Sequence, residues 1–234
     1  MTGAADRPIA ARVQVVPYDD CWPGRAAAEL AGLRAALGPL VCHADHIGST
    51  AVPGMAAKDI LDLQLSVHDL DTAAAAFDAP LARLGYTRLG YERDHVPAGD
   101  GSDPALWAKR YWRRRDHPAG DVNLHVRVAG SPNERLALLF RDWLRAHPLA
   151  VAAYARFKAE LARAVAGLDV YTEVRDPVVD LVVVAAARWA RDTAWQPHAT
   201  GNRGVTQATQ PPVRHADSAP AEPAAAHSVK PYAT

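Results

Sequence analysis

The sequence predicts an α+β domain, in which a mixed β-sheet is flanked by helices and followed by a helical C-terminal part. Residues 60–67 and 122–128 alternate between apolar and polar side chains, a period of two that is typical of strands with one buried face. Capping residues open longer segments of helical period between and after these strands. Strands cluster before residue 131 and helices follow it, which favours the α+β class.

The composition predicts how the 234 residues are divided. Residues 11–196 are long enough to form one well-packed domain, and residues 1–10 form a flexible N-terminus. Residues 197–234 contain six prolines and no leucine, isoleucine or phenylalanine. Such a segment buries too little apolar surface to offset its ordering entropy, so we expect a disordered tail rich in proline and alanine.

Charge and cysteine usage exclude several classes of protein. Lysine and arginine together number 26, as do aspartate and glutamate, so the balance argues against binding of bulk nucleic acid or an anionic membrane. Two cysteines do not make a disulfide framework, the N-terminus lacks a signal-peptide pattern, and no apolar run reaches the roughly 18 residues of a membrane span. We expect a cytoplasmic protein.

The first half of the domain begins with a short strand over residues 11–16. Pro23 then precedes a helix with leucines at helical spacing, and residues 40–47 form a strand that leads into a Gly48–Ser49 turn. In residues 60–67, the alternation places Asp62 and Gln64 on one face and leucines on the other. Asp69 or Asp71 caps the helix that follows, which runs to about Leu84.

The second half begins with a strand at Gly85–Tyr86 and a loop over residues 95–104. Strands follow over residues 106–114 and 122–128, and the polar face of the latter carries Asn123, His125 and Arg127. Ser131–Pro132–Asn133–Glu134 has the pattern of a capping box, and the helix that it opens should end before Pro148. A second helix carries Lys158, and Asp176–Pro177 opens a last helix that ends near Trp195.

The stretch from His46 to Leu65 carries the chemistry that the sequence offers. A glycine allows close approach of a ligand, and the Ser49 and Thr50 hydroxyls with nearby N–H groups can hold phosphate oxygens. Asp62, one strand later, can hold the divalent cation that neutralises those phosphates. This order suits a site for nucleotidyl transfer. An ordinary tight turn, with Asp62 paired to a basic residue, is the alternative.

Several segments together resemble one known family. Residues 46–58, His-Ile-Gly-Ser-Thr-Ala-Val-Pro-Gly-Met-Ala-Ala-Lys, closely resemble the signature of the GrpB family, and residues 123–126 and 139–148 resemble its later blocks. Residues 15–19 and 154–158 fit the same family, so the resemblance extends over about residues 11–189. It implies a nucleotidyltransferase-like fold and, because some members are fused to a dephospho-CoA kinase, a link to coenzyme A metabolism.

The resemblance also implies roles for individual residues. Asp62 matches the first acid of the superfold motif, whereas Gln64 stands at the second acid position and Asp59 replaces a common proline. His125 is the best-placed substitute for a third acid. The expected catalytic residues are Asp62 and His125, the expected ligands of Mg²⁺ or Mn²⁺ are Asp62, Gln64 and His125, and the expected phosphate-binding residues are His46, Gly48, Ser49, Thr50, Lys58, Arg127 and Arg141.

Each of these assignments has a structural alternative. The two histidines could be hydrogen-bonded structural residues, and Arg141 and Arg145 could form an ion pair with Asp142. Cys42, His43 and His46 invite a zinc interpretation, but their spacing is a weak signal. The basic and aromatic residues 109–115 could bind phosphates or nucleic acid, although an exposed basic strand face is the more common arrangement.

Two hypotheses for function follow from these observations. The first is a metal-dependent enzyme that transfers a nucleotidyl or phosphoryl group to a small acceptor. The second is a non-catalytic module that binds a nucleotide or CoA-type ligand as an accessory to coenzyme A synthesis, with dephospho-CoA kinase as a partner. Gln64 favours the second, because binding a nucleotide requires less metal charge than transferring part of it. A pure interaction scaffold is a weaker third option.

Overall fold

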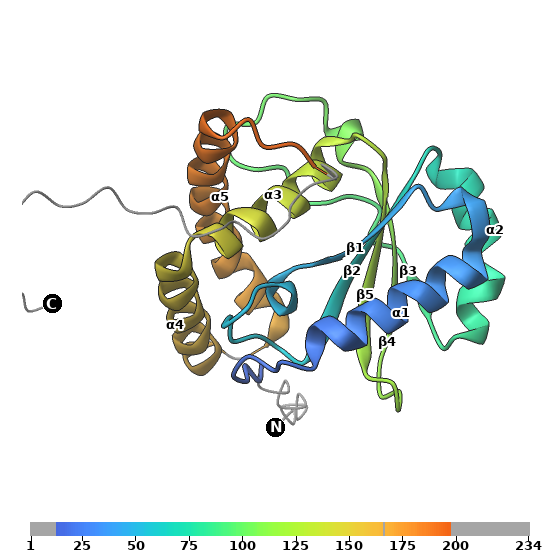
Figure 1. Cartoon of the computed structure of the whole chain (residues 1–234), viewed down its shortest axis with the longest axis horizontal. Coiled ribbons are helices and arrows are strands. Elements are labelled where there is room, and N and C mark those ends of the chain that lie inside the picture. The colour runs from blue at the N-terminus through green and yellow to red at the C-terminus, as the bar shows by residue number, and fades with distance from the viewer. Residues whose placement is uncertain (1–12, 166, 198–234) are drawn as a thin grey trace, which may run out of the picture. The chain divides into compact units, whose positions relative to one another are not determined.

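The computed structural model describes residues 13–165 and 167–197 (Figure 1). The predicted flexible N-terminus, residues 1–10, lies outside the described residues, as does the predicted tail from residue 198 onward. None of the helices within the described ranges is long and apolar enough to cross a membrane.

The first half of the chain forms the elements that carry the candidate turn. They are α1 (Trp22–Leu37), η1 (Gly38–Leu40), β1 (His43–Ile47), η2 (Ser49–Ala51), β2 (Ile60–Val67) and α2 (Leu70–Arg83). Proline opens α1, as predicted. Of the two predicted caps of α2, Asp69 is the cap, since its side chain accepts a hydrogen bond of 2.7 Å from the Thr72 N–H group.

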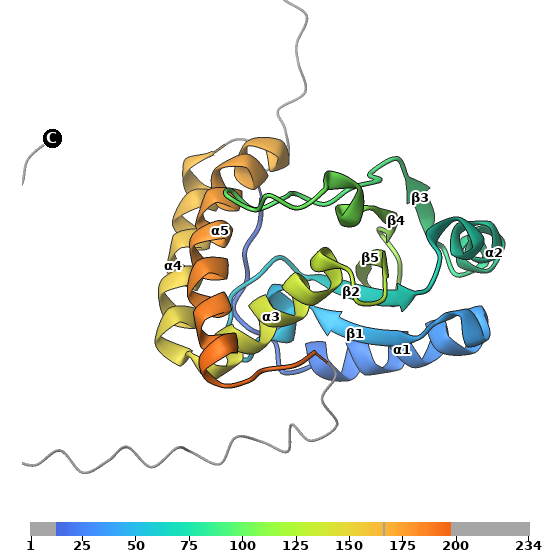
Figure 2. The same ribbon diagram turned by 90° about the horizontal axis from the view of Figure 1, so that it is seen from above.

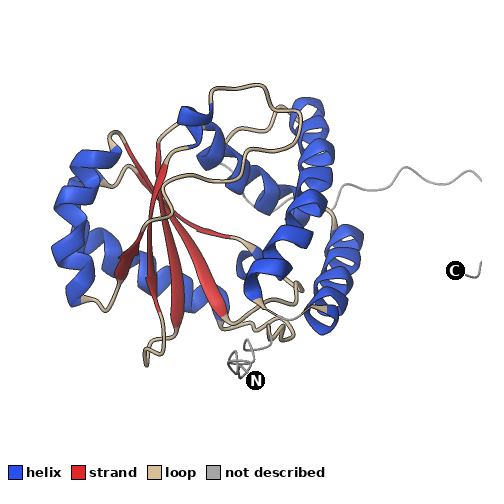
Figure 3. Ribbon diagram, turned by 180° about the vertical axis from the view of Figure 1, so that it is seen from behind, coloured by secondary structure: helices blue, strands red, loops and turns tan. Residues whose placement is uncertain are grey.

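The second half completes the sheet and adds the helical part. Its elements are β3 (Thr87–Leu89), η3 (Pro104–Trp107), β4 (Lys109–Arg114), β5 (Asp121–Val128), α3 (Pro132–Ala146), α4 (Pro148–Ala164) and α5 (Leu168–Asp192). The helix α3 ends before Pro148, as predicted. Figure 3 shows the twisted sheet beside the helices of the C-terminal part.

The five strands form one mixed sheet in the order β1-β2-β5-β4-β3. The strands β2 and β5 are parallel neighbours, and the other pairs are antiparallel. This pairing sets Asp62 beside Asn123 and Gln64 beside His125 in the register of β2 and β5. The predicted α+β fold with a mixed sheet flanked by helices is therefore confirmed.

The two faces of the sheet differ in polarity as the alternation predicts. Leucines of β2 and the apolar residues of β5 pack with α1 and α2 into the main core, in which Leu63, Leu124 and Phe77 are fully buried. The polar face, which carries Asp62 and His125, is turned toward the side on which α3, α4 and α5 gather (Figures 1 and 2). The sheet thus separates an apolar core from a polar site.

Three predicted boundaries were wrong for physical reasons. Within the described residues, the predicted N-terminal strand contributes only a bridge between Val16 and Ala57. The predicted strand over residues 106–114 starts at Lys109, because residues 104–107 form a 3₁₀ turn capped by Asp103. The last helix begins at Leu168 rather than at Asp176–Pro177, so Pro177 lies inside it.

The predicted capping box at the start of α3 is modified. Ser131 is the N-cap, but its hydroxyl makes no capping bond to the helix and instead donates a 2.6 Å hydrogen bond to the Val128 carbonyl. The Glu134 carboxylate accepts from the Gly130 N–H group at 2.7 Å and from the Ser66 hydroxyl. Glu134 therefore ties the start of α3 to the strand β2 rather than closing a local box.

Candidate functional site

A cavity of about 760 Å³ adjoins the polar face of the sheet. It is bordered by the turn at Gly48, the strands β2, β4 and β5, and the helices α3, α4 and α5. Among the described residues that line it, the cationic side chains are Lys58, Lys109, Arg113, Arg115, Lys158 and Arg175, and the carboxylates are Asp62 and Glu173. A volume in this range suits a nucleotide-sized ligand, and the excess of cations suits an anionic one.

Gly48 shapes the entrance to the turn. Its φ of 69° and ψ of −166° lie in a region that is essentially reserved for glycine. A Cβ at this position would also lie 2.8 Å from the Asp62 Cβ, closer than real Cβ atoms approach one another. The glycine therefore allows the Asp62 carboxylate to pack directly against the backbone of the turn.

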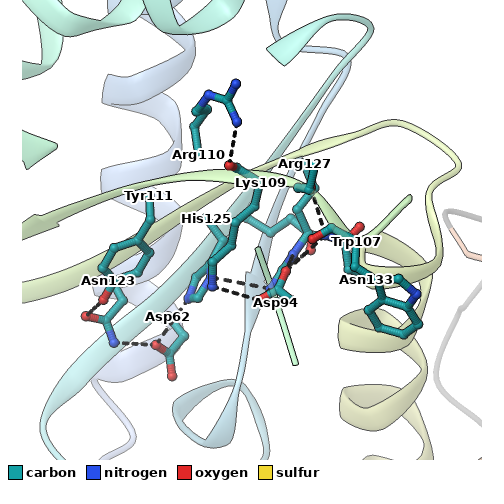
Figure 4. A network of polar contacts seen from close by, with 12 residues as sticks. Asp62, Asp94, Trp107, Lys109, Arg110, Tyr111, Asn123, His125, Arg127 and Asn133 are labelled. Carbon is teal, nitrogen blue, oxygen red and sulfur yellow. Dashed lines mark hydrogen bonds and ion pairs between the residues drawn. The ribbon is translucent and has the colours of Figure 1, made fainter. Parts of the chain in front are cut away.

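Asp62 is held by its neighbour in the sheet (Figure 4). The Asn123 amide donates a 2.7 Å hydrogen bond to Asp62 Oδ1, and the Asn123 oxygen in turn accepts from the Tyr111 hydroxyl at 2.7 Å. The His125 Nε2 atom lies 4.0 Å from the same Asp62 oxygen, beyond hydrogen-bonding distance. The parallel pairing of β2 with β5 thus brings together the two residues that were predicted to be catalytic.

The surroundings of His125 determine the protonation state and the tautomer of its ring. Burial, together with the nearby Arg127 and Lys109 cations, lowers its pKa well below the ordinary value, so the ring is neutral near neutral pH. A guanidinium can only donate, and Arg127 Nη2 lies 3.3 Å from His125 Nδ1, which assigns Nδ1 as the acceptor. The ring proton is therefore on Nε2, where it faces the cavity and Asp62 as a hydrogen-bond donor.

Lys158 is a site residue that the sequence analysis placed on a helix without assigning it a role. It is 3% exposed, and its Nζ atom donates a 2.8 Å hydrogen bond to the Ser49 hydroxyl. Burial, followed by repulsion from Arg175 and Lys58, lowers its pKa to about 7. The available signal was a lysine within the apolar stripe of α4, alongside Val151, Tyr154, Leu161 and Ala162.

Lys58 and Arg175 complete the cationic wall near the turn. The Lys58 ammonium lies 5.8 Å from the centre of the Tyr171 ring, and burial is the main cause that lowers its pKa. Burial opposes the charge on Arg175, but Tyr154 and Asp176 raise its pKa, so the guanidinium stays charged. The Arg175 Nη2 atom donates to Asp176 at 2.9 Å, whereas its Nε atom has no hydrogen-bond partner among the described residues.

Gln64 and Arg127 lie behind the cavity rather than on its lining. Both are buried, and the Arg127 guanidinium donates to the Gln64 side-chain oxygen and, at 2.8 Å, to Asp94. Asp94 also accepts from Lys109 at 2.7 Å and from Asn133 at 3.0 Å (Figure 4). Arg127 therefore contacts the acceptor atoms of both Gln64 and His125, and the predicted roles of these two residues as metal ligands stay predictions.

No group of three or more histidine, cysteine, aspartate or glutamate side chains within the described ranges is placed to hold a metal ion. This finding covers the weak zinc interpretation of Cys42, His43 and His46. The binding of Mg²⁺ or Mn²⁺ stays a prediction, and it rests on the Asp62 carboxylate.

His46 and Arg141 support the turn from outside the cavity. The His46 ring shares a 2.8 Å hydrogen bond with the Thr50 hydroxyl, and burial, with Arg145 and Arg141, lowers its pKa to about 4. Arg141 donates to the His46 carbonyl at 3.1 Å, and Arg145 donates to the Ala51 carbonyl at 2.9 Å. These contacts hold both ends of the turn, and the predicted phosphate contacts of His46 and Arg141 stay predictions.

Much of the basic cluster at residues 109–115 is engaged within the protein. Lys109 pairs with Asp94, and Arg114 makes a bidentate pair with Glu29 at 2.9 and 2.8 Å. Arg115 donates to the Asn123 side chain. Arg113 and Arg115 still line the cavity, so this cluster contributes to the cationic wall rather than to an exposed basic face.

These observations define an α+β protein with a cationic cavity between a mixed sheet and a helical C-terminal part. The chain belongs to the GrpB family: the family described as GrpB protein matches residues 12–184. It is similar to the crystal structure of the conserved protein GrpB from Enterococcus faecalis, with a TM-score of 0.63 and 25% identity over 76% of this chain and 99% of that chain. The resemblance at residues 46–58 is thereby confirmed.

Two curated relatives extend the comparison. The dephospho-CoA kinase of Mycolicibacterium paratuberculosis is 38% identical over 201 residues, which cover 80% of this chain and 49% of that protein. The UPF0157 protein YqkA of Bacillus subtilis is 29% identical over 181 residues, which cover 77% of this chain and 49% of that protein. The chain thus spans about half the length of these relatives.

Proposed function

We propose that the cavity binds the phosphate part of a nucleotide or CoA-type small molecule. One observation carries this proposal: Lys58, Lys158 and Arg175 line the cavity beside the Gly48–Ser49 turn. Several cations that face a small hydroxyl-bearing turn are the arrangement that binds phosphate oxygens in proteins.

The non-catalytic hypothesis is the one that the geometry supports best. Of the three predicted metal ligands, only Asp62 offers the cavity an acceptor, because Arg127 occupies Gln64 and His125. Cations rather than clustered carboxylates therefore supply the charge that would neutralise a phosphate. The similarity to proteins named dephospho-CoA kinase supports a ligand of the coenzyme A type and that kinase as a partner.

Thermal unfolding with a panel of ligands tests the proposal. The panel comprises ATP, ADP, AMP, CoA and dephospho-CoA, each with and without Mg²⁺. A ligand that binds only the folded state at about 100 times its Kd stabilises that state by about 2.7 kcal/mol, so the melting temperature rises. Arg156→Gln, which removes an exposed cation of α4, is the control variant and should show the same shift as the unchanged protein. No shift with any ligand would refute the proposal.

Transfer of a nucleotidyl or phosphoryl group is the second candidate. It is favoured by the close packing of the Asp62 carboxylate against the Gly48 backbone, which sets one acid beside the turn. In this interpretation Asp62 would bind Mg²⁺ or Mn²⁺, and the neutral His125 would donate a hydrogen bond from Nε2. Release of pyrophosphate or consumption of nucleotide, lost in Asp62→Asn, would support transfer, whereas binding without turnover would exclude it.

A further inference from the structure

The Ser49–Lys158 pair brings a buried amine from a distant helix to the turn. Lys158 is nearly fully buried, yet its ammonium group lies on the cavity lining with Ser49 Oγ 2.8 Å away. A buried amine is costly unless a counter-charge or good hydrogen bonds compensate for lost hydration. Ser49 supplies one hydrogen bond but no counter-charge. The ion pairs of the described residues include none in which a carboxylate pairs with Lys158.

The charges that face Lys158 come from every element around it. Asp62 on β2 attracts a proton to it, whereas Lys58 before β2 and Arg175 on α5 repel one. Its own helix contributes the Tyr154 ring, whose centre lies 5.1 Å from Nζ. With the lysine protonated, Lys58, Lys158 and Arg175, together with Arg113 and Arg115 elsewhere on the lining, stand against the carboxylates of Asp62 and Glu173, and Asp176 pairs with Arg175. This excess of positive charge attracts a doubly charged anion more strongly than a singly charged one.

We propose that Ser49, Lys158, Arg175 and Lys58 form a subsite for a terminal phosphate monoester, and that binding of this dianion places a proton on Lys158. The proposal rests on the proposed function and adds two properties to it: the class of phosphate that is recognised, and the coupling of recognition to a proton. A monoester carries a charge of about −1.5 to −2 near neutral pH, whereas a phosphodiester carries −1.

The direction of the pH dependence follows from the pKa of Lys158, which is about 7 in the empty site. A bound dianion raises this pKa, because an opposite charge nearby favours the protonated amine. Between about pH 6 and pH 7 the amine is already largely protonated and the affinity changes little, whereas below the second pKa of the monoester, about 6, the affinity falls as the dianion is lost. Above pH 7 binding must take up a proton, so the affinity falls by about tenfold per pH unit until the pH reaches the pKa of the bound state.

Two matched nucleotides test both properties. AMP and 3′,5′-cyclic AMP share a base and a sugar but carry a monoester and a diester. Titration calorimetry at pH 8, in two buffers with different heats of ionisation, gives the affinity and the number of protons taken up. We expect AMP to bind at least tenfold more tightly than cyclic AMP, with an uptake close to one proton. The monoester is itself fully ionised at pH 8, since its second pKa is about 6, and so takes up none.

Variants of Lys158 separate the effect of its positive charge from the effect of its uptake of a proton. Lys158→Arg keeps a fixed positive charge, so it should retain the preference for AMP and lose the proton uptake. Lys158→Met should lose both properties, and Arg156→Gln, an exposed residue of the same helix, should change neither. Circular dichroism checks that each variant is folded, and the comparison of the two nucleotides on the unchanged protein does not depend on any variant.

Each outcome decides the proposal. Preference for AMP with proton uptake in the unchanged protein, both lost in Lys158→Met, supports it. Equal binding of the two nucleotides, or binding of AMP without proton uptake, overturns it while leaving the proposed binding function intact. If neither nucleotide binds and dephospho-CoA, which lacks a phosphate monoester, shifts the melting temperature as much as CoA does, the subsite is likewise overturned and only the broader proposal survives. A shift with CoA, which carries a 3′-phosphate monoester, and none with dephospho-CoA supports the subsite. If no ligand of either experiment binds, both proposals fall.

Discussion

At the scale of single residues, Gly48 controls how close the acid of the site comes to the turn. Its backbone conformation is essentially limited to glycine, and the Asp62 side chain fills the space that a Cβ would need. Two independent constraints therefore act on one position. The neighbouring Gly54 has a similar φ of 76°, but a Cβ there would meet no atom within 4 Å. The pair allows conformational strain to be separated from steric contact.

Replacing each glycine by alanine tests this difference. Gly54→Ala should lower the free energy of unfolding by about 1–2 kcal/mol, the cost of a left-handed conformation. Gly48→Ala adds the displacement of Asp62, so a loss of about 2–5 kcal/mol is expected when a steric cost of about 1–3 kcal/mol is included. Urea unfolding of both variants gives the two values. Equal losses would show that the contact with Asp62 contributes nothing.

The role of Lys158 could not be predicted from the sequence, because it depends on a tertiary contact. A lysine within an apolar stripe is visible in the sequence, but the group that it contacts is 109 residues away. Gln64 shows the converse: it alternates correctly with Asp62 on the polar face, yet Arg127 of a neighbouring strand occupies its amide oxygen. The sequence shows which side chains are polar and on which face they lie, but their hydrogen-bond partners depend on tertiary contacts.

At the scale of elements, the start of α5 was predicted wrongly from the local preference of proline for the first turn of a helix. Proline is favoured in the first turn of a helix, so Asp176–Pro177 was a reasonable predicted start. In the structure the helix begins at Leu168, and Pro177 lies inside it, where it removes a backbone hydrogen bond. The core formed by Leu161, Ala162 and Tyr171 depends on the turns of α5 that precede the proline. Packing thus outweighs the local cost.

Substitution of Pro177 distinguishes the two starts of this helix. If Pro177 is inside the helix, Pro177→Ala should raise the free energy of unfolding by about 1–3 kcal/mol, because alanine restores the hydrogen bond and removes the steric conflict. Pro148→Ala, at the first position of α4, is the matched control and should give no gain. Chemical denaturation measures both. A loss of stability in Pro177→Ala would favour the start at Asp176 instead.

The strands were predicted better than the helix starts, because their periodicity is set by burial of one face. The alternation in residues 60–67 and 122–128 correctly separated core residues from the polar face in β2 and β5. The sequence could not show that these two strands are parallel neighbours, since β3 and β4 lie between them in the chain. The closeness of Asp62 and His125 depends on that pairing.

At the scale of the whole molecule, Asp94 joins the loop between β3 and β4 to the sheet and to α3. Its carboxylate accepts from Arg127 at 2.8 Å, from Lys109 at 2.7 Å and from Asn133 at 3.0 Å. The role of Asp94 could not be predicted, because nothing in the local sequence marks a loop aspartate as a partner of two strands. Through Arg127, the same carboxylate supports the orientation of His125 in the cavity.

Loss of the Asp94 charge should destabilise the protein strongly. In Asp94→Asn, the nearly buried cations of Arg127 and Lys109 would lose their counter-charge, and breaking a buried pair in this way costs about 3–5 kcal/mol. Glu160→Gln breaks an exposed pair with Arg163 and is the matched control, for which a change below about 1 kcal/mol is expected. Urea unfolding at pH 7 compares the two variants.

The pH dependence of this difference is a second measurement on the same pair of proteins. Burial opposes the ionised form of Asp94, but Arg127 and Lys109 outweigh it and hold the pKa of the carboxyl below its ordinary value. The unfolded chain therefore takes up a proton at this residue at a higher pH than the folded protein does. The stability that Asp94 contributes should be complete above about pH 5 and should decline as the pH falls below about 4. A difference between the unchanged protein and Asp94→Asn that stays constant down to pH 3 would show that the charge of Asp94 is not what holds the loop to the sheet.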